Sequence, residues 1–375
     1  MFLLIGFVSA CGSEGASTGD GTDADGTTAQ PDVAVNDTST PGDPCSDSNY
    51  TACQYDRPTY ATDTIDGELS EASYGRRLAI RVRFPTDAPG PRPVVVVSHG
   101  GTLNNKGHEL METWGETLAS AGYVAVHVAH ATFAEEGLPQ LCDAFDIPEG
   151  ECVASEEMFN PPVVLKPADA SLVFDELPKL GSLLSSQKGV EIDASKVACL
   201  GWSGGSQIPT SVAGAVRNAS PSVPVSSFDA RMLAGVVLSP QGPGFSGYFE
   251  DASGTSMDSV QRPLLVATGD NDYKESNELL FPSIRRKTFD NLPAGGDHHL
   301  LYSLLPIGVG GHGTYQLSDL SSSDEGLVRL SLALQSAVLA HLDAHLTDSQ
   351  SAAEYLASDK PKILSGADQT EWSRK

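Results

Sequence analysis

Short, uniformly apolar segments that alternate with segments of helical periodicity constrain the fold more than any other feature of the sequence. Residues 93–97 read Pro-Val-Val-Val-Val, and such a β-branched run is typical of a central strand that is buried on both faces. Residues 110–121 then place apolar side chains at helical spacing, and Gly122 is suited to cap the helix. Because residues 123–128 form the next apolar run, the order predicts a strand–helix–strand unit with parallel strands.

The same alternation continues to about residue 346. Further strands are predicted at 78–84, 196–200, 233–238, 263–268 and 299–305, and further helices at about 168–180, 205–218 and 327–346. Strands that alternate with helices at this spacing predict an α/β fold, with a mostly parallel central sheet that carries helices on both faces. Since ligands of such sheets bind where the strands end, a site is expected at the carboxyl edge.

The N-terminal part of the chain differs from this pattern. Residues 1–11 form a short apolar run that ends in Val-Ser-Ala-Cys, which resembles a bacterial lipobox and predicts an export signal cut before a lipid-carrying Cys11. Residues 12–72 are predicted to be an acidic low-complexity tether and N-terminal extension. The α/β domain is expected at 73–347, followed by a C-terminal tail at 348–375. We therefore expect an exported protein, either secreted or a bacterial cell-envelope lipoprotein that its N-terminal lipid attaches to the outer membrane or cell surface.

The charge of the chain limits its partners. Asp and Glu number 49 against 23 Lys and Arg, and the net charge at pH 7 is −26. A phosphate backbone binds to a basic face, so no nucleic-acid partner is expected. Solubility accounts for the acidic surplus, and steering of a cationic ligand is the alternative.

The predicted export allows disulfides among the six cysteines, because the compartments outside the cytosol are oxidising. Cys45 lies close in sequence to Cys53, and Cys142 to Cys152, each pair in a stretch with loop composition. Two disulfides, Cys45–Cys53 and Cys142–Cys152, are therefore expected. Cys199 sits in an apolar run and is expected to be a small buried hydrophobe.

A serine within a Gly-x-Ser-x-Gly pentapeptide is the first candidate for chemistry. The pentapeptide occurs around both Ser17 and Ser203, so the motif alone does not decide between them. Only Ser203 follows a predicted strand and precedes a predicted helix, which is the context that a nucleophile elbow needs. Gly201 and Gly205 would let strand and helix approach closely, and the N–H of Gly204 would stabilise a developing oxyanion.

A serine nucleophile requires a histidine base and a carboxylate that orients the histidine. The turn after the predicted strand at 263–268 offers two carboxylates, Asp270 and Asp272. Both follow the end of a strand, so both are expected at the edge of the sheet where Ser203 lies.

Three histidines compete for the role of the base. His312 lies in a glycine-rich loop after the predicted strand at 299–305, and such a loop would let an imidazole reach back to the serine. His298 and His299 open that strand, which would place them at the opposite edge of the sheet and in contact with solvent. The sequence therefore favours His312.

The second donor of the oxyanion hole is expected in the loop after residues 93–97. A backbone N–H of Gly101, or alternatively of Thr102, would complete the hole, while His99 is expected to pack that loop. His127 and His130 have a spacing that could hold zinc, but no third ligand is evident in the sequence. Neither a metal nor another cofactor is predicted.

Together these residues resemble the α/β-hydrolase superfamily, and within it the dienelactone-hydrolase-like and platelet-activating-factor-acetylhydrolase-like serine esterases. The resemblance covers about residues 76–346. It is carried by Val-Val-Val-Val-Ser-His-Gly-Gly at 94–101, Lys-Pro-Ala-Asp at 166–169, the elbow at 201–205, Ser-Pro-Gln-Gly-Pro-Gly at 239–244, the turn at Asp272 and the loop at His312. It implies a triad of Ser203, His312 and Asp272 that hydrolyses esters through an acyl-enzyme, with Asp270 as the alternative acid.

Three departures from the family pattern narrow that implication. Dienelactone hydrolases use cysteine where Ser203 stands, which argues against dienelactone as the substrate. The acetylhydrolases place the acid after the preceding strand, where this chain has Ser239, Pro240 and Gln241. This departure supports Asp272 as the acid, and it argues against a specific phospholipid as the substrate. Trp202 replaces the histidine of the common Gly-His-Ser elbow and is expected to form a wall of the acyl pocket or to pack in the core.

The leading expectation is a serine hydrolase without a cofactor, a lipase-like carboxylic ester hydrolase acting on a small-molecule, lipid or polyester ester. A peptidase or amidase of the same fold is the first alternative, because the same triad cleaves amides. A surface binding protein that keeps the fold without the reaction is the second. The sequence predicts no oligomeric state.

Overall fold

The computed structural model describes residues 45, 50–71, 76–101, 106–130, 148, 162–220, 223–244, 250–251, 254–274 and 278–375. Residues 43–375 form one compact unit. Four of the predictions lie outside the described residues. They are the export signal with Cys11, the other Gly-x-Ser-x-Gly serine Ser17, the alternative oxyanion donor Thr102 and the Cys142–Cys152 pair.

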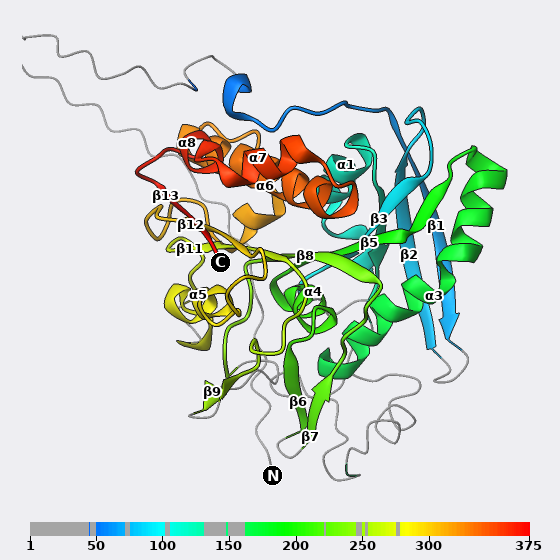
Figure 1. Ribbon diagram of the computed structural model, residues 1–375, viewed down its shortest axis with the longest axis horizontal. Coiled ribbons are helices and arrows are strands. Elements are labelled where there is room, and N and C mark those ends of the chain that lie inside the picture. Colours follow the sequence, from blue (N-terminus) through cyan, green and yellow to red (C-terminus); the bar gives the residue numbers. More distant parts are fainter. Residues whose placement is uncertain are drawn as a thin grey trace, which may run out of the picture. The chain divides into compact units, whose positions relative to one another are not determined.

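A nine-stranded sheet forms the centre of this unit, in the order β1-β2-β4-β3-β5-β8-β11-β12-β13 (Figure 1). The strands are β1 (Thr62–Glu71), β2 (Arg76–Pro85), β3 (Arg92–Ser98), β4 (Val124–Val128), β5 (Ile192–Trp202), β8 (Met232–Leu238), β11 (Leu264–Gly269), β12 (His299–Ser303) and β13 (Thr370–Arg374). Neighbouring strands from β4 to β12 run parallel, whereas β2 is antiparallel to both β1 and β4, and β13 to β12. The predicted α/β class with a mostly parallel sheet is therefore confirmed.

Two small antiparallel ladders accompany the main sheet in the described residues. One pairs β6 (Val216–Ser220) with β7 (Val223–Ser226), and the other pairs β9 (Glu250–Asp251) with β10 (Gly254–Thr255).

Alternate side chains of the central strands enter two separate apolar cores. In β3, Val94 and Val96 belong to one core and Val95 and Val97 to the other, because successive side chains of a strand point to opposite faces. The first core lies under α3 (Pro162–Lys188), α4 (Gln207–Val212) and α5 (Pro282–Asp290). The second core lies under α1 (Glu112–Ser120), α6 (Glu325–Leu346) and α8 (Lys360–Leu364). A further helix, α7 (Gln350–Ala357), packs on α6. Figure 1 shows these two groups of helices on opposite sides of the sheet.

α6 is the one helix in the described part of the chain that is long and apolar enough to cross a membrane. Its most apolar stretch is 72% buried inside the fold, and its leucines and alanines form much of the second core. Both features are typical of a core helix of a globular domain.

The edges of the domain extend beyond the predicted boundaries of 73 and 347. β1 pairs along its whole length with β2, and the expected tail forms α7, α8 and β13, which pairs with β12. Both edge strands have few apolar residues, so their patterns resemble loops. Their strand structure comes from pairing with the neighbouring strand.

The predicted helix at 205–218 is also shorter than expected. α4 ends at Val212, and Gly214 turns the chain with a φ of 118° before β6 begins at Val216. Such a φ is rarely adopted by residues other than glycine, so Gly214 ends the helix.

The predicted disulfide between Cys45 and Cys53 is confirmed. Both cysteines are buried in the second core, and the hydroxyl of Tyr355 in α7 donates to the carbonyl oxygen of Cys53 at 3.1 Å. The Cys45–Cys53 bridge is thereby tied to α7. Cys199 is a free, buried thiol, as expected, and burial raises its pKa.

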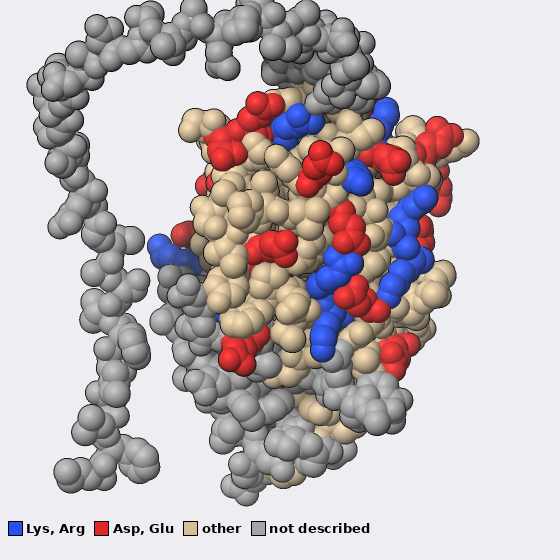
Figure 2. Space-filling model, turned by 90° about the vertical axis from the view of Figure 1, so that its left-hand side faces the viewer, with Lys and Arg blue, Asp and Glu red and all other residues tan. Residues whose placement is uncertain are grey.

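Acidic and basic side chains are interspersed on the face of the molecule drawn in Figure 2. Several described arginines form ion pairs with neighbouring carboxylates, including Arg81 with Asp66 and Arg286 with Glu371. Exposed pairs of this kind contribute at most about 1 kcal/mol each to stability.

Candidate active site

Ser203 occupies a sharp turn between β5 and α4. β5 ends at Trp202, and a turn of 3-10 helix at Ser203–Ser206 leads directly into α4. The φ of Ser203 is 54°, in the left-handed region that residues other than glycine avoid. Such a conformation costs about 1–3 kcal/mol, so the surrounding structure has to enforce it.

Gly201 and Gly205 permit the close approach that enforces this turn. A Cβ on Gly201 would lie 2.1 Å from the carbonyl oxygen of Gly205, and a Cβ on Gly205 would lie 2.3 Å from that of Ser98. The blocking atoms belong to the backbone and cannot move away by a side-chain rotation. Both positions therefore require glycine, as the sequence predicts.

Replacing Gly205 by alanine is expected to lower the free energy of unfolding by about 3 kcal/mol or more, because the new methyl group would overlap two backbone carbonyls. Urea unfolding followed by circular dichroism measures this change. Gly67→Ala in β1 is the matched control, since its Cβ would meet only Ile80 at an ordinary 3.7 Å. A Gly205→Ala variant as stable as the Gly67→Ala variant would show that the turn at Gly205 and the end of β3 do not approach this closely.

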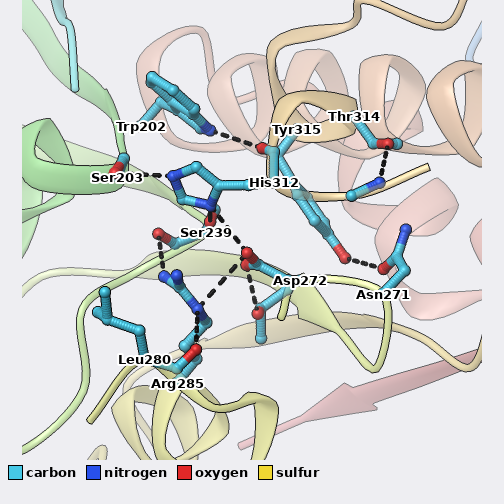
Figure 3. Close-up of polar contacts among 12 residues, drawn as sticks. Trp202, Ser203, Ser239, Asn271, Asp272, Leu280, Arg285, His312, Thr314 and Tyr315 are labelled. Atoms are coloured by element: carbon cyan, nitrogen blue, oxygen red, sulfur yellow. Dashed lines mark hydrogen bonds and ion pairs between the residues drawn. The ribbon is translucent and has the colours of Figure 1, made fainter. Parts of the chain in front are cut away.

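The structure brings Ser203, His312 and Asp272 together in one hydrogen-bonded row (Figure 3). The Nε2 of His312 lies 2.8 Å from the Oγ of Ser203, and its Nδ1 lies 2.8 Å from the Oδ1 of Asp272. A carboxylate accepts the Nδ1 proton, which leaves Nε2 free to accept the proton of the serine. The His312 side chain is 33% exposed, so solutes can reach this row.

Asp272 is held ionised although its side chain is 0% exposed. It accepts a hydrogen bond from Thr268 at 2.9 Å, and the Nε of the buried Arg285 lies 3.4 Å from its Oδ1. Burial alone would raise its pKa, but the hydrogen bond from His312 and the charge of Arg285 hold the pKa of Asp272 below its usual value.

Asp270, the alternative acid, faces a different partner. Its Oδ1 accepts the hydroxyl proton of Tyr302 at 2.6 Å. The sequence left open which of the two carboxylates orients His312. The hydrogen bond from His312 goes to Asp272, so the geometry favours Asp272.

Ser239 is a member of the site that the sequence did not identify. It follows β8 directly, is buried, has a φ of 47°, and its Oγ lies 2.6 Å from the Nδ1 of His312. Arg285 donates to its carbonyl oxygen at 3.1 Å. His312 is thus held at Nδ1 by two neighbouring strand ends.

Gly101 and Gly204, the predicted oxyanion donors, lie beside each other. A Cβ on Gly204 would be 3.4 Å from the backbone nitrogen of Gly101. Gly101 follows β3, which pairs with β5, so two adjacent strand ends supply the two backbone N–H groups. Removal of such a donor typically lowers kcat by about 10²–10³-fold.

Trp202 packs against His312. Its Nε1 donates to the carbonyl oxygen of His312 at 3.0 Å, and the two rings lie 4.7 Å apart. The side chain is half-buried and also contacts the second core. It therefore fixes the loop that carries His312 and packs in part against the core, one of the two roles expected from the sequence; nothing in the structure tests the acyl-pocket role.

His298 and His299 are not solvated, and that expectation was wrong. They stand at the start of β12 as predicted, but both are buried, because β13 covers this edge of the sheet and Trp372 stacks on His299 at 5.2 Å. The Nδ1 of His298 accepts the backbone N–H of Leu264 at 3.1 Å. Burial lowers the pKa of both imidazoles to about 4.

His99, His127 and His130 have structural partners. His127 donates from Nδ1 to the carbonyl oxygen of Leu110 at 3.0 Å, and burial lowers its pKa to about 3. The Nε2 of His99 accepts the backbone N–H of His130 at 3.1 Å, so His99 packs its loop as expected. Among the residues that the structure describes, no group of three or more His, Cys, Asp or Glu is arranged to hold a metal ion.

A second Ser–His–Asp row lies in the interior. His130 contacts Asp169 through Nδ1 at 2.7 Å and Ser98 through Nε2 at 2.7 Å. All three residues are almost completely buried, whereas Ser203 and His312 are partly exposed. A serine that no substrate can reach does no chemistry, so this row joins the end of β3 to the segment after β4 and to α3.

Comparison with known families does not assign the chain. None of the protein-family models matches the sequence, and no curated protein matches it. A function has to come from the residues of the site itself.

Proposed function

We propose that the chain is a carboxylic ester hydrolase of the α/β-hydrolase fold, with Ser203 as nucleophile, His312 as base and Asp272 as the orienting acid. One observation carries the proposal. Ser203 stands at a left-handed turn after a central strand, partly exposed, with its Oγ 2.8 Å from the Nε2 of a histidine that an ionised aspartate orients.

The positions of the three residues on the sheet support this function. Ser203 follows β5, Asp272 follows β11 and His312 lies in the loop after β12, so all three come from carboxyl ends of parallel strands. Active sites of open α/β sheets form at this edge. The chain order of serine, acid and histidine is that of α/β-hydrolases.

In the proposed reaction, the Nε2 of His312 takes the proton of Ser203 while Oγ bonds to the ester carbonyl carbon. The carbonyl π electrons move to the oxygen, and this oxyanion accepts N–H bonds from Gly204 and Gly101. When the oxyanion collapses, the C–O bond to the alcohol breaks and His312 protonates the leaving oxygen. Water then attacks the acyl-enzyme by the same steps, releasing the carboxylic acid and restoring Ser203.

The proposal extends to an exported enzyme. Disulfides persist in oxidising compartments and are rare in the cytosol, so the Cys45–Cys53 bridge supports export. The apolar run at residues 1–11 and the lipobox-like Cys11 favour a cell-envelope lipoprotein or a secreted protein whose substrate is an ester outside the cytosol.

A fluorophosphonate probe is expected to label the wild-type protein once, at Ser203, because an activated serine displaces fluoride from phosphorus. Intact-mass spectrometry with peptide mapping measures the label. Ser203→Ala should remain unlabelled, and Ser17→Ala, which removes the other Gly-x-Ser-x-Gly serine, should label like the wild type.

The same preparations separate the alternatives. Short-chain p-nitrophenyl esters should be hydrolysed faster than peptide p-nitroanilides, and the reverse order would replace the esterase by a peptidase. A folded wild-type protein that neither binds the probe nor turns over any ester would favour the non-catalytic binding protein.

A further inference from the structure

A buried lysine stands next to the oxyanion hole. Lys166, in the first turns of α3, is only 8% exposed, and its Nζ lies 3.4 Å from a Cβ built on Gly204. The backbone nitrogen of Gly101 lies at the same distance from that point. The ammonium group and the two backbone donors therefore surround one small volume beside Ser203.

Among the residues that the structure describes, Lys166 forms no ion pair. Asp169, the carboxylate one turn along α3, is hydrogen-bonded to His130. Burial and the nearby guanidinium of Arg217 lower the pKa of Lys166 to about 8, and Asp169 opposes this in part. The side chain is thus mainly protonated at neutral pH although a buried, unpaired cation is costly.

The interior Ser–His–Asp row holds Lys166 in this place. Asp169 lies three residues further along α3, on the same side of the helix, and is tied through His130 to Ser98 at the end of β3. Ser98 precedes the loop that carries Gly101, and its carbonyl oxygen is the atom that a Cβ on Gly205 would strike. The row therefore fixes α3, the oxyanion loop and the elbow to one another.

We propose that Lys166 is a third donor of the oxyanion hole and gives the hole a positive charge. This inference rests on the proposed ester hydrolysis. The ammonium donates an N–H to the carbonyl oxygen as that oxygen becomes negative, without transferring its proton, and releases it when the oxyanion collapses. A fixed cation in a water-poor site stabilises such a charge more strongly than a neutral amide does.

Lys166→Met tests the proposal, because methionine keeps the length of the side chain and removes the charge. We expect kcat on a neutral p-nitrophenyl ester to fall about 10²-fold with little change in KM, as for the loss of one oxyanion donor. Lys166→Arg, which keeps a cation, should retain more of the rate than Lys166→Met does. Lys179→Met, the same substitution at a 77% exposed position of α3, is the matched control and should behave like the wild type.

The pH profile gives a readout that a structural role of Lys166 would not move. In the described part of the chain, the charges of Asp169 and Arg217 act on Lys166, Lys166 acts on the buried imidazole of His99, and His130 is hydrogen-bonded to Asp169. Because Lys166 loses its proton above about pH 8, kcat/KM of the wild type should decline there. That alkaline decline should be absent from both Lys166→Met and Lys166→Arg.

The outcomes separate this inference from the function on which it rests. A wild-type protein without turnover and without fluorophosphonate labelling overturns both. An active wild type whose Lys166→Met variant keeps kcat and the alkaline decline overturns the role of Lys166 alone. A loss confined to esters that carry a carboxylate would instead make Lys166 an anchor for the substrate, and this also overturns the oxyanion role.

Discussion

Replacing Ser203 by alanine is expected to lower kcat on short-chain p-nitrophenyl esters by about 10⁶-fold, the size of effect that loss of a serine nucleophile has in other serine hydrolases. The physical reason is that the acyl-enzyme cannot form, and only the oxyanion donors and substrate binding remain to accelerate attack by water. Steady-state kinetics with extensively purified protein measures the residual rate.

In the Ser203→Ala variant, a loss of rate caused by unfolding can be told apart from one caused by the missing hydroxyl. Alanine keeps the Cβ of Ser203, so thermal unfolding should change little, and any loss of rate then reflects the missing hydroxyl. Ser195→Ala, at the exposed amino end of the same strand β5, is the matched control and should retain full activity. Equal turnover by the Ser203→Ala variant and the wild type would place the chemistry elsewhere on the molecule.

Replacing Asp272 by asparagine is expected to lower kcat by about 10⁴-fold, as the corresponding change does in a chymotrypsin-type triad. The amide would present an N–H to His312, so Nδ1 would become the acceptor and the imidazole proton would sit on Nε2. In that tautomer Nε2 cannot accept the proton of Ser203. Arg285 would also lose its buried counter-charge, which typically costs about 3–5 kcal/mol of stability. Kinetics and urea unfolding of the same preparation measure the two effects.

Ser239 offers a direct test of the geometry behind this prediction. Its Oγ already lies 2.6 Å from the Nδ1 of His312, and Arg285 donates to its carbonyl oxygen. A carboxylate at this position could take over the orienting role, so the double variant Asp272→Asn with Ser239→Asp should regain part of the lost rate. Asp270→Asn is the control and should stay within a few-fold of the wild type, and a larger loss from Asp270→Asn than from Asp272→Asn would contradict the assignment.

The centre of the fold follows from the sequence because its strands are buried on both faces. Such strands have to be apolar throughout, so the runs at 93–97 and 123–128 are visible without any structure. The edge strands β1 and β13 carry many polar residues, and their strand structure depends on pairing with a distant segment. No local pattern encodes that pairing, which explains the misplaced domain boundaries.

The candidate site follows the same division. Ser203, Asp272 and His312 each come after an apolar strand, so their common edge could be predicted from order alone. Ser239 follows a strand as well, and that position was a usable signal. Arg285 and the Asp169–His130 contact could not be found in this way, because they join elements whose packing the chain order does not specify.

The interior row of Ser98, His130 and Asp169 also limits how this molecule can change over generations. Its members bond to one another in the interior, so loss of one removes a hydrogen bond from a buried polar group, at a cost of about 0.5–1.5 kcal/mol. During evolution, Ser98, His130 and Asp169 would therefore be kept together or replaced together. Ser203 and His312 are partly exposed, and water can take up a bond that either one loses. A lineage that no longer needed the proposed reaction could lose Ser203 and His312 one at a time and still keep the buried row, whereas the buried Asp272 would stay as the counter-charge of Arg285.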